Sequence, residues 1–468
     1  MINQRKMSWQ RLRQSVLLLA VLCVVLAFLH GCTKARRPKP NILLIIVDTV
    51  RADHLGVHGY KRDTSPAMDA FARENIMFEY ATSAAPWTPP AVASIITGLY
   101  PASHRMMPPN ERDLARRQAV KLNSNLETLT ETLKRHGYRT AGYTSNPWTG
   151  EVFNYNQGFD DYTFDDRAPA NKITDYGIAA LERLTSENKH SAPWYLYLHY
   201  LDPHDPYKPP SPYDTMFSAE PPDAPIKYTE KMVRNINLYD GEIRFMDDHI
   251  GRLFKAMRQR SLYDDTVIII VGDHGEQFLE HGDHRHGFQL YNEELHVPLL
   301  LKMSADGDRG VRVRETVNHI DIYPTLLTLA GIDVPPQYNG IPLFDISRLS
   351  KRSGVLSEIR RRYDQRAFVD REGRKIIFKV DFSLETSSWE SSTPRWNEQA
   401  AVVLGLFDRH KNYTELEPLK DAALGSQLAR NFWEHYRALS PAHGASDETE
   451  TNISDETLDQ LRSLGYVE

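Results

Sequence analysis

The chain has 468 residues, 41% of them hydrophobic and 25% charged, which is enough apolar content for a sizeable core and predicts one large domain with a smaller one. Acidic and basic residues are interspersed, and the formal net charge is −6. Proteins that bind nucleic acid carry a basic surface, so this composition argues against nucleic acid as a partner.

The N-terminus has the pattern of an export signal. Basic residues between positions 5 and 13 precede an apolar run over residues 16–29. The run is shorter than the roughly 20 residues that span a bilayer, so a permanent transmembrane helix is the weaker interpretation. The next segment, Leu29-His30-Gly31-Cys32, is similar to the lipobox of bacterial lipoproteins, in which the cysteine is acylated. An uncleaved anchor or a plain secretory signal is the alternative.

We therefore expect a lipoprotein-type signal peptide over residues 1–31, lipidation at Cys32 and a tether over residues 32–40. Such a protein is exported to the bacterial cell envelope and held at the membrane by its lipid, facing the periplasm. The other cysteine, Cys23, lies inside the apolar run, so the mature chain has no internal disulfide and depends on its core for stability.

Three apolar runs predict buried strands. They cover residues 41–47, 194–201 and 266–272 and are rich in β-branched and aromatic residues. A strand that is apolar on both faces, as the first is, belongs in the middle of a parallel sheet. Each run leads into acidic residues or histidines, and open α/β sheets build their sites at the carboxyl ends of their strands.

The remaining patterns divide the chain into two regions. Helical patterns at residues 126–136 and 232–257 alternate with the strands and predict a layered α/β domain over residues 41–345. Residues 346–468 read as a smaller α+β subdomain with a tail. Its predicted elements are strands at 365–369 and 375–380, a helix at 426–438 and a polar, acidic and flexible segment at 443–456.

A hydroxyl stands just ahead of an apolar, helix-capable run in residues 85–98. Thr88 is followed by Pro89 and Pro90, whose fixed φ suits helix entry and whose missing amides would have no helical partner there. The unpaired N–H groups and the dipole of a helix start favour an anion such as sulfate or phosphate. The pattern predicts Thr88 as a nucleophile at a helix start. A proline-rich loop before an ordinary buried helix is the alternative.

Candidate metal ligands follow two of the predicted strands. Asp48 comes after the first, and Asp273 and His274 come after the last. A sulfate or phosphate ester resists attack until its charge is partly neutralised, which a divalent metal does while lowering the pKa of a nucleophilic hydroxyl. We therefore predict one divalent cation held by Asp48, Asp273 and His274, with Thr88 also on it. A helix cap at Asp48 and a polar turn at Asp273-His274 are the alternatives.

Histidines are concentrated after the last of these strands. Imidazoles can bind metal, hold an anion or protonate a leaving alkoxide. We predict that His286 contacts the transferred anion, and we assign no role to His281 or His284. His204 follows another strand and can donate to an ester oxygen, with a proline-rich turn as the alternative. The histidines of the cluster are His274, His281, His284, His286 and His296.

Taken together, these motifs resemble the sulfatase family, within the alkaline phosphatase superfamily. The resemblance implies a central, mostly parallel mixed sheet sandwiched by helices, a smaller C-terminal subdomain and one metal beneath the nucleophile. By position it implies Asp48, Asp273 and His274 as ligands, and His204 and His286 as contacts of the transferred group. The motifs stand in the family's order at residues 41–56, 88–101, 271–275, 296–299, 321–327 and 461–466.

The chain departs from the family at several positions. Thr88 stands where the family has a cysteine or serine that is oxidised to formylglycine, and threonine cannot give that aldehyde. Val92 replaces the supporting arginine, Thr49 replaces the second ligand of an Asp-Asp pair, and the family's lysine and histidine are missing near residues 144–148. The resemblance implies Ca²⁺, whereas a nitrogen ligand such as His274 suits Mn²⁺ or Zn²⁺ better.

Threonine is the nucleophile of related phosphodiesterases and phospho-headgroup transferases. The first functional hypothesis is therefore an exported metal-dependent hydrolase of sulfate or phosphate esters, acting through Thr88 on a sugar, lipid or aryl compound. The second is a transferase that passes a phospho-headgroup to a sugar or lipid near the membrane. The third is a sulfatase-like protein that binds an anionic glycan or lipid without turnover. The presence of Asp48, Asp273 and His274 argues against the third.

Overall fold

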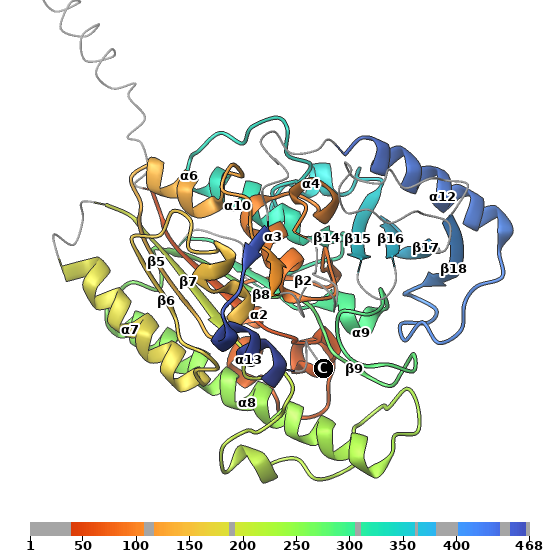
Figure 1. Cartoon of the computed structure of the whole chain (residues 1–468), viewed down its shortest axis with the longest axis horizontal. Helices are drawn as coiled ribbons and strands as arrows, with labels where there is room; N and C mark the ends of the chain where they lie inside the picture. Colours follow the sequence, from red (N-terminus) through yellow and green to blue (C-terminus); the bar gives the residue numbers. More distant parts are fainter. Residues whose placement is uncertain are drawn as a thin grey trace, which may run out of the picture. The chain divides into compact units, whose positions relative to one another are not determined.

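An eight-stranded sheet forms the centre of the fold in this computed structural model, with the strand order β13-β2-β12-β8-β1-β7-β5-β6 (Figure 1). The structure describes residues 39–106, 117–186, 192–304, 310–360, 364–380, 401–439 and 450–464. The strands of the sheet are β1 Asn41–Val47, β2 Ile76–Phe78, β5 Arg139–Thr144, β6 Asp161–Phe164, β7 Trp194–Tyr200, β8 Thr266–Gly272, β12 Leu299–Lys302 and β13 Val311–Val313.

The predicted strands are confirmed, and they are neighbours. β1 pairs in parallel with β8 on one side and β7 on the other, and β7 pairs in parallel with β5. β12 runs antiparallel to both β8 and β2, so the sheet is mixed but mostly parallel, as expected. Side chains of β1 are buried on both faces of the sheet, which explains why its sequence is apolar without alternation.

Helices cover the two faces of the sheet. Ile42, Leu44 and Ile46 of β1 pack into one core, and Leu43 and Ile45 pack into the other. In Figure 1, α7 and α8 lie below the sheet, and α3, α6 and α10 lie above it. The first core includes α3 Thr88–Thr97, α6 Leu129–Arg135, α10 Ile322–Leu329 and α13 Asp455–Ser463, and the second includes α2 Pro66–Glu74, α7 Ala170–Ser186 and α8 Glu230–Gln259.

A smaller antiparallel sheet follows near the C-terminus and carries one long helix, α12 Ala422–Arg437. Phe368 and Phe378 of this sheet pack against Phe432 and Trp433 of α12 in a third core. The predicted strands and helix of this region are thus confirmed, while the boundary at residue 345 stays a prediction. The strands are, in order, β15 Gly354–Arg360, β16 Asp364–Asp370, β17 Arg374–Val380 and β18 Ala401–Asp408.

The acidic segment predicted to be flexible is partly ordered, so that prediction is wrong for its described part. β19 Glu450–Asn452 pairs antiparallel with β4 Gln118–Val120, and α13 begins at Asp455. The polar side chains of this segment did not predict its order, because strand pairing uses backbone groups.

Short elements complete the fold: β3 Ala81–Thr82, α4 Pro101–His104, β9 Gln277–Phe278, β10 His284–Arg285, α9 Asn292–Leu295, β11 His296–Val297, β14 Val317–Asn318, α11 Ile346–Leu349, and the 3₁₀ helices η1 Ala52–His54, η2 Gly56–His58, η3 Pro147–Thr149, η4 Glu151–Phe153, η5 Tyr213–Thr215 and η6 His319–Asp321.

The predicted signal peptide over residues 1–31 and the predicted lipidation site Cys32 lie outside the described residues, as does most of the predicted tether. Among the residues that are described, no helix has both the length and the apolar character needed to cross a membrane.

Candidate metal and ester-binding site

Four adjacent strands end at the same edge of the central sheet. Their register places the ends of β8, β1, β7 and β5 side by side, since Val47 is opposite both Gly272 and Tyr200, and Thr144 is opposite His199. Asp48 and Asp273 directly follow β1 and β8, while Asn146 and His204 stand in the loops that follow β5 and β7. The candidate site therefore lies where an open α/β sheet places its ligands.

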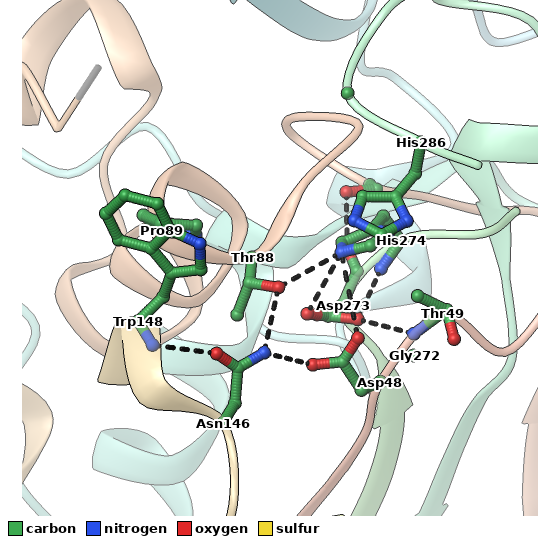
Figure 2. Close-up of polar contacts among 12 residues, drawn as sticks. Asp48, Thr49, Thr88, Pro89, Asn146, Trp148, Gly272, Asp273, His274 and His286 are labelled. Atoms are coloured by element: carbon green, nitrogen blue, oxygen red, sulfur yellow. Dashed lines mark hydrogen bonds and ion pairs between the residues drawn. The ribbon is translucent and has the colours of Figure 1, made fainter. Parts of the chain in front are cut away.

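The three predicted metal ligands converge. Asp48, Asp273 and His274 each offer one ligand atom, and these atoms all lie within 4.8 Å of one another. His274 Nε2 lies 3.4 Å from Asp273 Oδ2 and 4.0 Å from Asp48 Oδ1. All three side chains are fully buried. Figure 2 shows them facing one point from the ends of β1 and β8.

The donor atoms of this group fit a cation. Asp48 Oδ1 and Asp273 Oδ2 are buried and have no hydrogen-bond partner among the described residues, which is costly for carboxylate oxygens unless a positive charge lies between them. The ring of His274 is oriented by the carbonyl of Gly275, 2.9 Å from Nδ1. Because that carbonyl only accepts, Nδ1 carries the proton and Nε2 keeps its lone pair. Two carboxylate oxygens and one imidazole nitrogen suit Mn²⁺ or Zn²⁺ and admit Ca²⁺ less readily.

The two carboxyl groups differ in their tendency to ionise. Burial raises the pKa of Asp48, but a hydrogen bond from His199 and the electrostatic effect of the neighbouring imidazoles, His204 first, outweigh burial and leave this pKa below its usual value. Burial and the negative charge of Asp48 raise the pKa of Asp273 to about 6. The two carboxylates therefore repel each other until a positive charge enters between them.

Thr88 reaches this group from the first residue of α3. Trp87 is the extended N-cap residue, and prolines occupy the first turn, as the sequence predicted. Thr88 Oγ1 lies 3.2 Å from His274 Nε2, and Thr88 is fully buried. Its hydroxyl also accepts a hydrogen bond of 3.2 Å from Asn146 Nδ2. A helix start, a hydroxyl and a candidate cation-binding group thus meet at one place (Figure 2).

His204 and His286, predicted to contact the transferred group, lie against the cluster. The ring centroid of His286 is 4.4 Å from that of His274 and 4.8 Å from that of His204. His204 Nδ1 donates to the carbonyl of Asp205 at 2.5 Å, and His286 Nδ1 lies 3.3 Å from a carboxyl oxygen of Glu276. Burial lowers the pKa of His204, although the charge of Asp48 opposes this effect.

The other histidines of the cluster make contacts elsewhere. His281 Nδ1 pairs with Glu293 at 2.5 Å, and His296 Nε2 donates to the carbonyl of Glu79 at 2.9 Å. His284 is exposed. Of the histidines in this stretch, therefore, only His274 and His286 lie at the candidate site.

Sequence reasoning missed two residues of the site. Asn146 donates from Nδ2 to Asp48 Oδ2 at 2.6 Å, and His199 Nε2 lies 3.1 Å from the same oxygen. The Asn146-Pro147 pair after an apolar segment was a usable signal for Asn146, because a capping side chain at a strand end lies at the same sheet edge. His199 is inside β7 and carried no such signal.

Comparisons with known proteins identify the family of the chain. The family model described as Sulfatase matches residues 40–332. The chain is 29% identical over 347 residues to an ulvan-active sulfatase of Formosa agariphila, covering 67% of this chain and 65% of the relative. It is 25% identical over 389 residues to an arylsulfatase of Clostridium perfringens, covering 66% and 78%. The alignment with the first relative thus spans somewhat less than two thirds of that protein's length.

Solved structures share the fold. A phosphonate monoester hydrolase from Silicibacter pomeroyi superposes with a TM-score of 0.65 at 20% identity, covering 89% of this chain and 99% of the other. BT4656, solved in complex with its substrate D-glucosamine-2-N,6-O-disulfate, superposes with a TM-score of 0.66 at 17% identity, covering 86% and 99%. The family model spans more than half of the chain, and the buried acidic group is typical of that family. The chain therefore belongs to the sulfatase family of ester hydrolases.

Proposed function

We propose that the protein is a metal-dependent hydrolase of sulfate or phosphate esters in which Thr88 is the nucleophile. The observation that carries this proposal is the position of Thr88 Oγ1, 3.2 Å from His274 Nε2 at the edge of a group with two unpartnered carboxylate oxygens. A nucleophile must lie beside the charge that activates it, and the start of α3 also favours the anion being transferred.

The proposed roles follow from the donor atoms. Asp48, Asp273 and His274 would hold one divalent cation, which when bound neutralises ester charge and lowers the pKa of a neighbouring hydroxyl. His204 and His286 lie against the cluster, where they would hold the oxygens of the transferred group and supply a proton to the departing oxygen.

Under this proposal the reaction proceeds in two steps, formation of a covalent intermediate on Thr88 and its hydrolysis. Thr88 Oγ1 forms a bond to sulfur or phosphorus and loses its proton, while the bond to the departing oxygen breaks and that oxygen takes a proton. Water then attacks the same sulfur or phosphorus, releases the anion and restores the Thr88 hydroxyl. Threonine cannot form an aldehyde hydrate, so water must break this second ester bond directly.

The substrate class is also a proposal. One relative is named as ulvan-active, and one structural neighbour was solved with a sulfated glucosamine, which supports a sulfated carbohydrate. Another neighbour is a phosphonate monoester hydrolase, which supports attack at phosphorus. A threonine nucleophile favours attack at phosphorus, because threonine is the nucleophile of the related phosphodiesterases and phospho-headgroup transferases.

We also propose that the protein is exported and anchored through Cys32. The support is the basic and apolar N-terminal pattern followed by Leu29-His30-Gly31-Cys32. Cys32→Ser should release the protein into the soluble exported fraction. Membrane association equal to that of the wild type would contradict acylation at Cys32.

The catalytic proposal is tested by comparing turnover of an aryl sulfate, an aryl phosphate monoester and an aryl phosphodiester. The purified protein is first treated with chelator and then supplied with Mn²⁺, Zn²⁺ or Ca²⁺ in turn. We expect turnover of at least one ester that depends on added metal and is lost in Thr88→Ala. Turnover that persists in Thr88→Ala would rule out Thr88 as the nucleophile.

A further inference from the structure

One oxygen of Asp48 is held by two buried side chains. His199 Nε2 lies 3.1 Å from Asp48 Oδ2, and Asn146 Nδ2 lies 2.6 Å from it (Figure 2 shows the Asn146 contact). All three side chains are fully buried. The second oxygen, Oδ1, has no hydrogen-bond partner in the part of the chain that the structure describes, and it lies 4.0 Å from His274 Nε2. Hydrogen bonds thus fix Oδ2 of the carboxylate and leave Oδ1 available to a cation.

Both donors are themselves held in orientation. Asn146 Oδ1 accepts a hydrogen bond of 2.8 Å from the backbone N–H of Trp148, so the amide cannot flip without losing that bond. A carboxylate only accepts, so His199 Nε2 must carry a proton. In the neutral ring Nδ1 then accepts, and the hydroxyl of Tyr197 lies 3.2 Å from it.

We infer that His199 and Asn146, here called the Asp48 brace, are positioning residues that turn Asp48 Oδ1 toward the divalent cation. This inference rests on the proposed function, because it takes Asp48 as a cation ligand. Side chains that orient a ligand commonly change metal affinity about 10- to 100-fold when they are removed. A carboxylate that is free to rotate loses conformational entropy each time the cation binds, and this loss weakens binding.

Asn146 differs from His199 in one respect. Its amide nitrogen has two hydrogens and also donates to Thr88 Oγ1 at 3.2 Å. Asn146 therefore contacts both the proposed cation ligand Asp48 and the proposed nucleophile Thr88. Loss of His199 should affect only cation binding, whereas loss of Asn146 should affect cation binding and the reaction of Thr88.

The test measures the affinity of the whole, chelator-treated protein for Mn²⁺ alone by isothermal titration. We expect His199→Phe to weaken Mn²⁺ binding roughly 10- to 100-fold. His199→Gln should restore most of the affinity, because the Gln side-chain amide can place an N–H donor near the position of Nε2. The matched control is His104→Phe, since His104 is equally buried but pairs with Ser94, and it should bind Mn²⁺ as the wild type does.

Kinetics separate the two members of the brace. At saturating Mn²⁺, His199→Phe should recover a kcat close to that of the wild type. Asn146→Ala should stay about tenfold or more below it, because Thr88 has lost a donor that no cation concentration replaces. Equal recovery of both variants would overturn the separate role of Asn146.

Three further outcomes decide the inference. Wild-type Mn²⁺ affinity in a folded His199→Phe, together with loss of binding in Asp48→Ala, would overturn the brace and leave the proposed function intact. Wild-type affinity in Asp48→Ala would overturn the proposed cation site and the brace with it. If His199→Phe does not fold, Tyr197→Phe decides, with weakening of about threefold expected and unchanged affinity contradicting the inference.

Discussion

Thr88 Oγ1 and His274 Nε2 are 3.2 Å apart although 186 positions separate the two residues in the chain. One comes from the start of a buried helix, and the other follows the end of a central strand. This contact joins the proposed nucleophile to the group that contains the carboxylates of Asp48 and Asp273, and the first two predictions concern this group.

Removal of the Thr88 hydroxyl should abolish turnover. Thr88→Ala is expected to lower kcat on an activated aryl ester by on the order of 10³-fold or more, because no other group takes the place of a nucleophile. Thr88→Ser keeps the oxygen and should retain measurable activity. Mn²⁺ titration and thermal unfolding of both variants check that the site and fold persist. Thr88→Ser as inactive as Thr88→Ala would count against attack by the hydroxyl.

The cation-free protein should be stabilised by Asp273→Asn. Burial and the charge of Asp48 raise the pKa of Asp273 to about 6, so ionised carboxylates oppose each other at neutral pH. An amide at position 273 can donate to the unpartnered Asp48 Oδ1, and we expect a gain of roughly 1–2 kcal/mol in unfolding free energy in chelator.

With Mn²⁺ present, the wild type should be more stable than Asp273→Asn. At about 100 times its dissociation constant, Mn²⁺ would stabilise the wild type by ~2.7 kcal/mol and Asp273→Asn far less. Urea unfolding with chelator and with Mn²⁺ measures both effects. If Asp273→Asn is less stable than the wild type in chelator, repulsion between Asp48 and Asp273 does not destabilise the cation-free protein.

Stability should fall with rising pH because of Glu242. Burial and the nearby charge of Asp202 raise the pKa of Glu242 to about 9, while in the unfolded chain it stays near 4.5. The folded state therefore binds more protons between these two values, and unfolding free energy decreases as pH rises through that window. Glu242→Gln keeps an acceptor for the Lys208 N–H and should be more stable than the wild type at pH 8 by ~2 kcal/mol.

Urea titrations at pH 5 and pH 8 provide the measurement, and the gain should be much smaller at the lower pH. Asp223→Asn is the control, because Asp223 is exposed and pairs with Lys61, which is also exposed. It should change stability by less than about 0.5 kcal/mol at either pH. A pH-independent effect of Glu242→Gln would show that the carboxyl does not titrate differently on folding.

Arg352 should be required for stability. Its guanidinium donates to both oxygens of the buried Asp321 carboxylate, at 2.7 Å and 2.5 Å. Arg352→Met leaves that charge unpaired and is expected to cost about 3–5 kcal/mol in urea unfolding. Arg348→Met removes an exposed arginine nearby and should cost less than about 0.5 kcal/mol. A small effect of Arg352→Met would mean that the backbone donors of Asn318 and Ile341 suffice for Asp321.

Most elements of the central fold could be predicted because their signals are local. The strands β1 and β8 match their apolar runs residue for residue, and α3 begins at Thr88, where the prolines predicted a helix start. The candidate metal-binding group could be recognised for the same reason, since Asp48 and Asp273 stand directly after apolar runs and His274 follows Asp273. The order seen at β19 was missed because a polar segment can pair through its backbone whatever its side chains.

The sequence by itself determined which segments become strands and helices, and that acidic, histidine and hydroxyl groups stand at their ends. Only the tertiary structure decided which of these groups meet. Asn146 and His199 lie 98 and 151 positions from Asp48, and nothing in their local sequence specifies that contact. The physical reason is that apolar patterning buries a strand without choosing its neighbours. Strand order and register come from packing of the whole sheet between its helices, and they alone bring the ends of β5, β7, β1 and β8 together.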